Sequence, residues 1–135
     1  MKLAYFDCSS GIAGDMVLGA LLSAGLDEKA WRRELGQLKL PVRISVRRVR
    51  RGVIAATSVS VAAPQGGEER GLKELLRLIR RSRFPRPVEE RSAAVFERLA
   101  RAEAKVHGTS IDRVHFHEVG GYDCLVDIVG AALGL

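Results

Sequence analysis

The sequence predicts an α/β fold of the α+β kind, in which a small mixed sheet containing a hairpin packs against about five helices. Apolar and polar residues alternate on both sides of a turn predicted at Arg51-Gly52, as is typical of a hairpin with one solvent-exposed face. Elsewhere, apolar residues recur in steps of three and four, which is typical of amphipathic helices. With 135 residues, 47% of them apolar, we expect one domain spanning 1–135. The alternating apolar positions are Val42, Ile44 and Val46 before the turn, and Thr57, Val59 and Val61 after it.

The N-terminal run Leu3–Phe6 is short and apolar, which predicts a buried strand ending at Asp7. A loop of small residues follows, from Cys8 to Asp15. Its glycines would let a ligand approach backbone amides at a helix start, but the spacing matches neither the Walker loop nor the dinucleotide fingerprint. Asp15 falls in the first helical turn, where the macrodipole alone favours a carboxylate. We expect Met16–Ala24, apolar on nearly every side, to form a central buried helix.

The middle of the chain predicts three further helices. Asp27 is placed to cap the first, and prolines at Pro85 and Pro87 are placed to start the last and longest. Each helix has one apolar stripe expected to face the core. The stripes are Trp31, Leu35 and Leu38; then Leu72, Leu75, Leu76 and Ile79; then Val88, Ser92, Val95, Leu99, Ala102 and Val106.

The charge is unevenly distributed. The formal net charge is +6, and the span from Arg32 to Arg86 holds 15 basic and 4 acidic side chains. Such a band attracts anions, including nucleotide phosphates, but only Trp31 and Phe84 flank it as aromatics, which disfavours nucleic-acid binding. No apolar run is long enough to span a bilayer, and the N-terminus lacks the features of a signal peptide. We therefore expect a cytoplasmic protein in which Cys8 and Cys124 are reduced and buried.

The stretch from His115 to Asp127, HFHEVGGYDCLVD, concentrates two histidines, a glutamate and two aspartates in thirteen residues. If the segment starts as a strand, His115 and His117 share a face, whereas Asp123 and Asp127 share a face if a helix follows. Such a combination of imidazole and carboxylate suits a metal or acid/base site, and we expect Asp15 to approach it from the other helix start.

A structural interpretation of the same stretch stays open. Asp123 could cap the helix, and the histidines could satisfy buried backbone groups. Asp127 is a carboxylate inside an apolar run, so it needs either a partner, such as an arginine, or a metal. Imidazole suits nickel, zinc, copper and iron, and carboxylates extend the choice to magnesium and manganese, so the residues do not rank the metals.

Two long motifs, FDCSSGIAGDM and KVHG…VHFHEVGGYDCLVDIVG, together with GVIAAT in the hairpin, resemble the N-terminal region of the nickel-insertion proteins of the nickel-pincer cofactor pathway. The resemblance covers nearly the whole chain. It implies a CTP-dependent nickel chelatase, a cyclometallase of the lyase class. Its substrate would be pyridinium-3,5-bisthiocarboxylic acid mononucleotide, and its product the nickel-pincer cofactor of lactate racemase.

The resemblance also assigns roles to residues. It implies catalytic roles for Asp7, Asp15, Glu118 and Asp127, binding of the substrate or cofactor by Ser10, Gly11 and Gly14, and metal ligation by His115, His117 and Asp123. Two features depart from the family pattern. Pro64–Gly71 has no histidine where many members are histidine-rich, and Cys8 and Cys124 replace small non-thiol residues.

Members of that family are longer than this chain, and the site for CTP and its divalent metal belongs to a C-terminal part that is absent here. The expected partners are therefore the pyridinium mononucleotide and a missing C-terminal domain or companion chain, and a homo-oligomer stays open. The alternative is a non-catalytic scaffold, or a module that binds metal or anions, with catalysis elsewhere.

Overall fold

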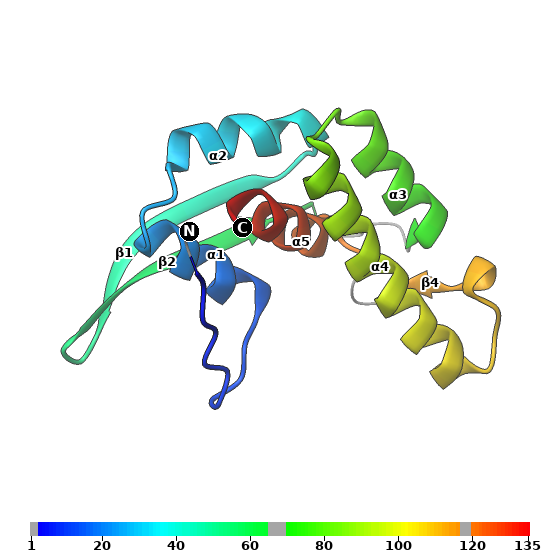
Figure 1. The fold of residues 1–135 in the computed structure, drawn as a ribbon, viewed down its shortest axis with the longest axis horizontal. Helices are drawn as coiled ribbons and strands as arrows, with labels where there is room; N and C mark the ends of the chain where they lie inside the picture. The colour runs from blue at the N-terminus through cyan, green and yellow to red at the C-terminus, as the bar shows by residue number, and fades with distance from the viewer. Residues whose placement is uncertain (1–2, 65–69, 117–119) are drawn as a thin grey trace.

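A computed structural model of the chain describes residues 3–64, 70–116 and 120–135. The α/β class is confirmed, with five helices (Figure 1). Within these residues the strands form two separate antiparallel pairs, β1–β2 and β3–β4, and not one mixed sheet. The helices are α1 (Gly14–Ser23), α2 (Glu28–Leu35), α3 (Leu72–Arg81), α4 (Arg86–His107) and α5 (Tyr122–Gly134); the strands are β1 (Arg43–Arg51), β2 (Ile54–Ala62), β3 (Arg70–Gly71) and β4 (His115–Phe116).

The predicted hairpin is present. Arg43 pairs with Ala62 at one end and Arg51 with Ile54 at the other, so the turn consists of Gly52-Val53, one residue later than predicted. Val59 is buried, and Ile44, Val46 and Val61 pack against the same core. Helix α1 lies on β2, where Gly19 comes so close to the carbonyl oxygen of Thr57 that a side chain would not fit. The hairpin therefore packs against one side of α1.

Helix α5 is the centre of the structure, packing against α1, α2, α4 and β2 (Figure 1). Contacts between α1 and α5 advance along both helices together: Gly14 meets Asp127, Leu18 meets Gly130, and Leu21 meets Gly134. The two helices are therefore parallel, and their N-termini lie at the same end. Glycine allows this approach, because a Cβ on Gly130 would lie 3.0 Å from Leu18 Cδ2 and 3.0 Å from Trp31 Cζ2.

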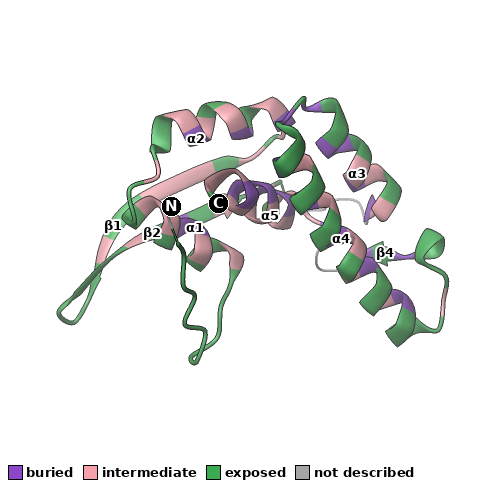
Figure 2. Cartoon of the chain, viewed as in Figure 1, coloured by how far each residue is buried: buried purple, intermediate pink, exposed green. Residues whose placement is uncertain are grey.

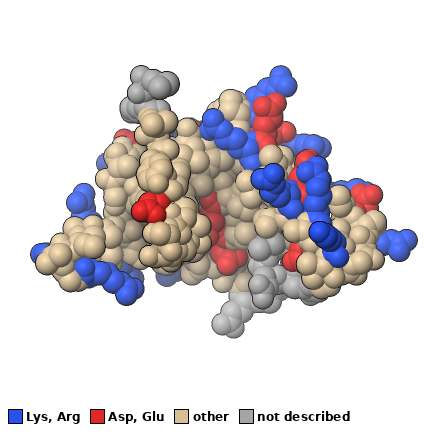
Figure 3. Space-filling model, turned by 60° about the horizontal axis from the view of Figure 1, so that its bottom comes forward, with Lys and Arg blue, Asp and Glu red and all other residues tan. Residues whose placement is uncertain are grey.

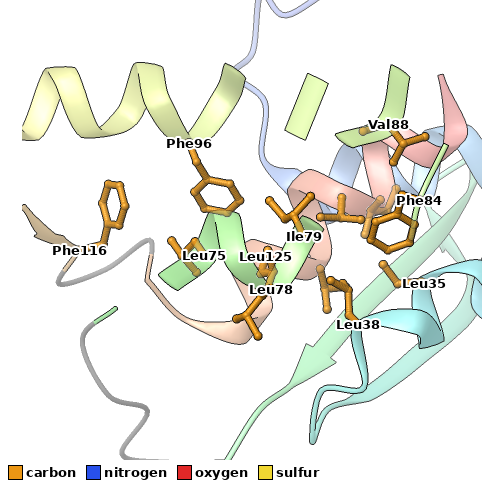
Figure 4. Close-up of a cluster of buried hydrophobic side chains, with 14 of the residues drawn as sticks. Leu35, Leu38, Leu75, Leu78, Ile79, Phe84, Val88, Phe96, Phe116 and Leu125 are labelled. Atoms are coloured by element: carbon orange, nitrogen blue, oxygen red, sulfur yellow. The ribbon is translucent and has the colours of Figure 1, made fainter. Parts of the chain in front are cut away.

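The remaining helices complete the core on the other side of α5. Phe96 of α4 and Phe116 of β4 are buried with ring centroids 6.4 Å apart, next to Leu75 and Ile79 of α3 (Figure 4). The stripe predicted for α4 is right at Val88 and Ser92 and only partly right beyond them, since Leu99 packs against the core but Val95, Ala102 and Val106 are exposed. The buried residues continue in steps of four as Phe96, Ala100 and Ala104. Phe96, which the predicted stripe skipped, has the largest buried side chain of the helix and sets its orientation.

Three expectations about the N-terminal region are wrong. Leu3–Phe6 forms no strand, and its side chains are exposed (Figure 2), because no strand lies beside it in the described part of the chain. Helix α1 is buried only at Leu18 and Gly19, since the hairpin and α5 cover one side and leave Met16 57% exposed. Cys8 is exposed rather than buried, although both cysteines are free as predicted.

Candidate functional site

Three aspartates lie where α1 and α5 begin. Asp15 is in the first turn of α1, Asp123 is in the first turn of α5, and Asp127 follows one turn later. The Asp127 side chain packs onto Gly14, since a Cβ at that position would come within 2.5 Å of Asp127 Cβ and 2.6 Å of its Cγ. The parallel packing of the helices therefore seats one carboxylate directly against the start of the neighbouring helix.

The environment of Asp127 disfavours its ionised form. Burial, followed by the nearby charges of Asp15 and Asp123, raises the pKa of this carboxyl from the usual 3.8 to about 6. Its Oδ1 atom is buried and has no hydrogen-bond partner among the residues that the structure describes. A carboxyl group whose pKa lies this close to neutral pH can change its protonation state when a cation binds nearby.

No arginine neutralises Asp127. Among the residues that the structure describes, no salt bridge includes Asp15, Asp123 or Asp127. The arginine partner considered from the sequence is therefore not present in this part of the chain. The positive ends of the α1 and α5 dipoles offset part of the negative charge, but the raised pKa of Asp127 shows that the compensation is incomplete.

Asp123 does not cap α5 in the way considered from the sequence. The N-cap position is Gly121, which offers no side chain, and Asp123 lies two residues further on with its Oδ1 turned back over that glycine. Asp15 accepts a hydrogen bond from the Met16 amide at 2.8 Å, within its own helix. Both carboxylates are exposed, so solvent and ligands can reach the cluster.

The loop before α1 is exposed. Asp7 Oδ1 accepts a hydrogen bond from the Ser9 amide at 3.1 Å, which lowers the pKa of Asp7. The Gly11 amide donates to the Cys8 carbonyl at 2.9 Å, and Gly11 has φ +88°, a conformation that favours glycine. The two glycines thus have different structural roles. Gly11 permits the turn, and Gly14 makes room for the Asp127 side chain.

The histidine motif is described in part. His115 lies on β4 opposite Gly71 and is exposed, whereas the next residue, Phe116, points into the core. His117 and Glu118 lie outside the described residues, so the shared face of the two imidazoles and the predicted proximity of Asp7 to His117 stay predictions. Over residues 3–64, 70–116 and 120–135, no group of three or more His, Cys, Asp or Glu side chains is arranged to hold a metal ion.

Arg70 organises the turn that leads into α5, and sequence analysis missed it. Its guanidinium carbon lies 3.9 Å from the centroid of the Tyr122 ring, and Nη1 donates to the Gly120 carbonyl at 3.2 Å. The Nε atom is 3.4 Å from Oε1 of Glu74. Although arginine is rarely buried, this residue is only 5% exposed. Because Arg70 lies in a basic stretch of the sequence, it was expected to be solvated. The pairing of β3 with β4 brings it to the turn at Gly120-Gly121.

The environment of Cys124 disfavours its thiolate form. Burial, followed by the charges of Asp123 and Asp127, raises the pKa of this thiol to about 11. A thiol must lose its proton to bind a metal, so this environment opposes ligation by Cys124.

The surface charge follows the fold. On the face drawn in Figure 3, some acidic side chains lie in a central hollow, and others lie outside it, several of them beside Lys and Arg side chains. No helix within the described residues has the length and apolar character needed to cross a membrane.

Comparison with known proteins assigns the family. The family model described as "Nickel insertion protein" matches residues 4–135. The chain is 47% identical over 135 residues to the pyridinium-3,5-bisthiocarboxylic acid mononucleotide nickel insertion protein of Desulfitobacterium hafniense. It is 50% identical over 135 residues to a protein of Roseiflexus castenholzii described as a candidate nickel insertion protein.

Each of these alignments covers 99% of the chain but 34% of the relative, so the chain spans about a third of the length of these relatives. No solved structure matches the chain. The family match extends over both motifs and over the helices that bring the three aspartates together. This chain therefore belongs to the nickel insertion protein family.

Proposed function

We propose that this chain is the N-terminal part of a cytoplasmic nickel chelatase. The enzyme would insert nickel into pyridinium-3,5-bisthiocarboxylic acid mononucleotide and so form the nickel-pincer cofactor of lactate racemase. The family match and the name of the Desulfitobacterium hafniense relative support the substrate. Two free cysteines fit a reducing compartment. CTP and its divalent metal, and the lyase chemistry that depends on them, are assigned to polypeptide beyond this chain.

The observation that carries the proposal is the half-buried Asp127, whose Oδ1 atom has no partner and whose pKa is raised to about 6. A carboxylate without a counter-ion, next to two further carboxylates, attracts a divalent cation. A cation bound there would favour the ionised form of Asp127, so binding near pH 6, where the group is partly protonated, would release protons. This site would hold nickel with modest affinity, as suits an ion that must be handed on.

The cluster would supply only part of the ligand set, because the described residues contain no complete metal site. In this proposal Asp123 and Asp127 contribute oxygen ligands, and Asp15 contributes charge from α1. His115, His117 and Glu118 remain candidates for the imidazole and carboxylate ligands. Asp7, Ser10, Gly11 and Gly14 remain candidates for contacts with the substrate, whose anionic groups would be attracted by the basic band from Arg32 to Arg86.

A scaffold role is the second candidate, and one observation favours it. Asp15 and Asp123 lie in the first turns of their helices, where carboxylates stabilise a helix without binding any ligand. In this interpretation the chain only supports a catalytic part located elsewhere.

Nickel titration of the purified chain separates the two candidates. Asp127→Asn keeps the volume of the side chain and removes its charge, so the site proposal predicts that nickel affinity falls about tenfold or more, as for the loss of a ligand or its outer-shell partner. Isothermal titration calorimetry at pH 7, with circular dichroism to verify the fold, is the measurement.

Asp112→Asn is the matched control, since Asp112 is an exposed aspartate whose nearest cation is Lys73 at 3.1 Å. It should leave nickel affinity unchanged. Equal affinity in the wild type and Asp127→Asn would overturn the site proposal and favour the scaffold.

A further inference from the structure

The segment Leu3–Phe6 presents a run of apolar side chains to water. Leu3 and Tyr5 are each 88% exposed, and Phe6 is 44% exposed. Single exposed apolar residues are common on protein surfaces, but a consecutive run of them marks an interaction site more often. The apolar surface continues after the loop, where Ile12 is 53% and Met16 57% exposed.

The backbone of the segment is also uncovered. Within the described residues, none of the backbone hydrogen bonds outside the helices and strands involves Leu3–Phe6, and neither sheet includes it. The composition predicts a strand, yet the segment has no strand beside it. A segment of large apolar side chains whose amides and carbonyls have no backbone partner among the described residues can add as a strand to the edge of another sheet.

We infer that Leu3–Phe6 docks as a strand onto the polypeptide that, in the longer relatives, lies outside the third matched by this chain. This additional polypeptide would provide the edge of a β-sheet, with apolar side chains beside it. Two facts favour it: each of two relatives is covered by the chain to only 34%, and the family match begins at residue 4, so it includes residues 4–6 of the segment.

A second copy of this chain is a poorer occupant. Stable association of two proteins buries on the order of 1,200–2,000 Å² in total. A pair of four-residue segments is too short to supply this area alone, whereas the remaining two thirds of a relative is large enough to contact more of the chain than these four residues.

Docking of Leu3–Phe6 would also affect the aspartate cluster, through the loop that leads to α1. Phe6 is followed directly by Asp7 and by the loop that enters α1 at Gly14, against which Asp127 packs. Fixing residues 3–6 on a neighbouring sheet would thus fix one end of the loop that leads to Asp15.

The test compares the 135-residue chain with a chimera in which it replaces the matching third of the Desulfitobacterium hafniense relative. Hydrogen exchange at the amides of Leu3–Phe6 should be fast in the chain and at least about tenfold slower in the chimera. The double variant Leu3→Asp/Tyr5→Asp should leave the melting temperature of the chain unchanged, because both side chains are exposed there, and should lower that of the chimera.

Val53→Asp is the matched control, since Val53 is 90% exposed at the hairpin turn, and it should lower neither melting temperature. Should the chimera not fold, the remaining two thirds of the relative, produced separately, should bind the wild-type chain and Val53→Asp but not the double variant in sedimentation velocity.

Three results would overturn the inference: equal exchange in chain and chimera, no association of the separate parts when the chimera does not fold, or dimers of the chain alone that the double variant abolishes. None of these experiments uses nickel or substrate, so their outcome does not depend on whether the proposed function is correct.

Discussion

At the scale of single residues, the most informative group is Asp127. The sequence marked it correctly as a carboxylate out of place in an apolar run. The structure adds that Gly14 lies against it, a contact that the sequence did not indicate. Helical spacing predicted the relation between Asp123 and Asp127. Asp15 was expected to approach from the other helix start, and the packing of α1 on α5 brings it close enough to raise the pKa of Asp127.

The raised pKa of Asp127 predicts how stability depends on pH. The unfolded chain ionises this group near its usual pKa of 3.8, whereas the folded chain does so at about 6. Between these values the folded state holds more protons, so the free energy of unfolding falls as pH rises from about 4 to about 6. After discounting for partial exposure, the fall should be about 1–2 kcal/mol.

In Asp127→Asn this fall should be absent, because the amide does not titrate, and at pH 7 the variant should be at least as stable as the wild type. Urea denaturation of both proteins at several pH values measures this. A large loss of stability in Asp127→Asn would indicate a hidden cationic partner instead.

Gly14 permits a second prediction. A methyl group there would collide with the Asp127 side chain and the start of α5, so Gly14→Ala should force the two helices apart. Overpacking of this kind costs about 1–3 kcal/mol. Gly36→Ala is the control, because a Cβ at Gly36 meets nothing within 4 Å and its φ is −59°. Thermal melts in which both variants behave alike would contradict this account of Gly14.

At the scale of elements, the sequence predicted the individual helices and the hairpin better than their environments. Asp27 caps α2 by accepting a hydrogen bond from the Ala30 amide at 2.7 Å, and Trp31 and Leu35 are buried as predicted. Local signals of this kind lie within one or two turns of chain. The buried face of α4 was predicted only in part after Ser92, because it depends on the contact of Phe96 with Phe116 from a distant strand.

The turn before α5 depends on Arg70. Arg70→Lys keeps the positive charge but loses the planar contact with Tyr122 and the fork that reaches Gly120. We expect a loss of stability of about 2 kcal/mol, from a partly desolvated cation–π contact and a charged hydrogen bond. Arg80→Lys should change stability little, since Arg80 is exposed and 3.8 Å from Glu89. Thermal unfolding of the two variants provides the comparison.

At the scale of the whole molecule, the fold class and the family were accessible from the sequence, because they depend on patterns and motifs that extend over most of the chain. The strand predicted at Leu3–Phe6 shows the limit of this approach. Composition indicates what a segment can form, but a strand also needs a neighbour, and no neighbour is present among the described residues.

The parallel packing of α1 and α5 has a consequence for the order of folding. Asp15 and Asp127 lie far apart in the sequence, yet the charge of Asp15 acts on the Asp127 carboxyl. Contacts between such distant segments carry a large loop-closure entropy and form slowly. While the chain emerges from the ribosome, α1 and the hairpin can pair early, but the acidic cluster has to wait for α5. A nascent chain would thus be unable to capture a cation at this position before the whole module has been synthesised.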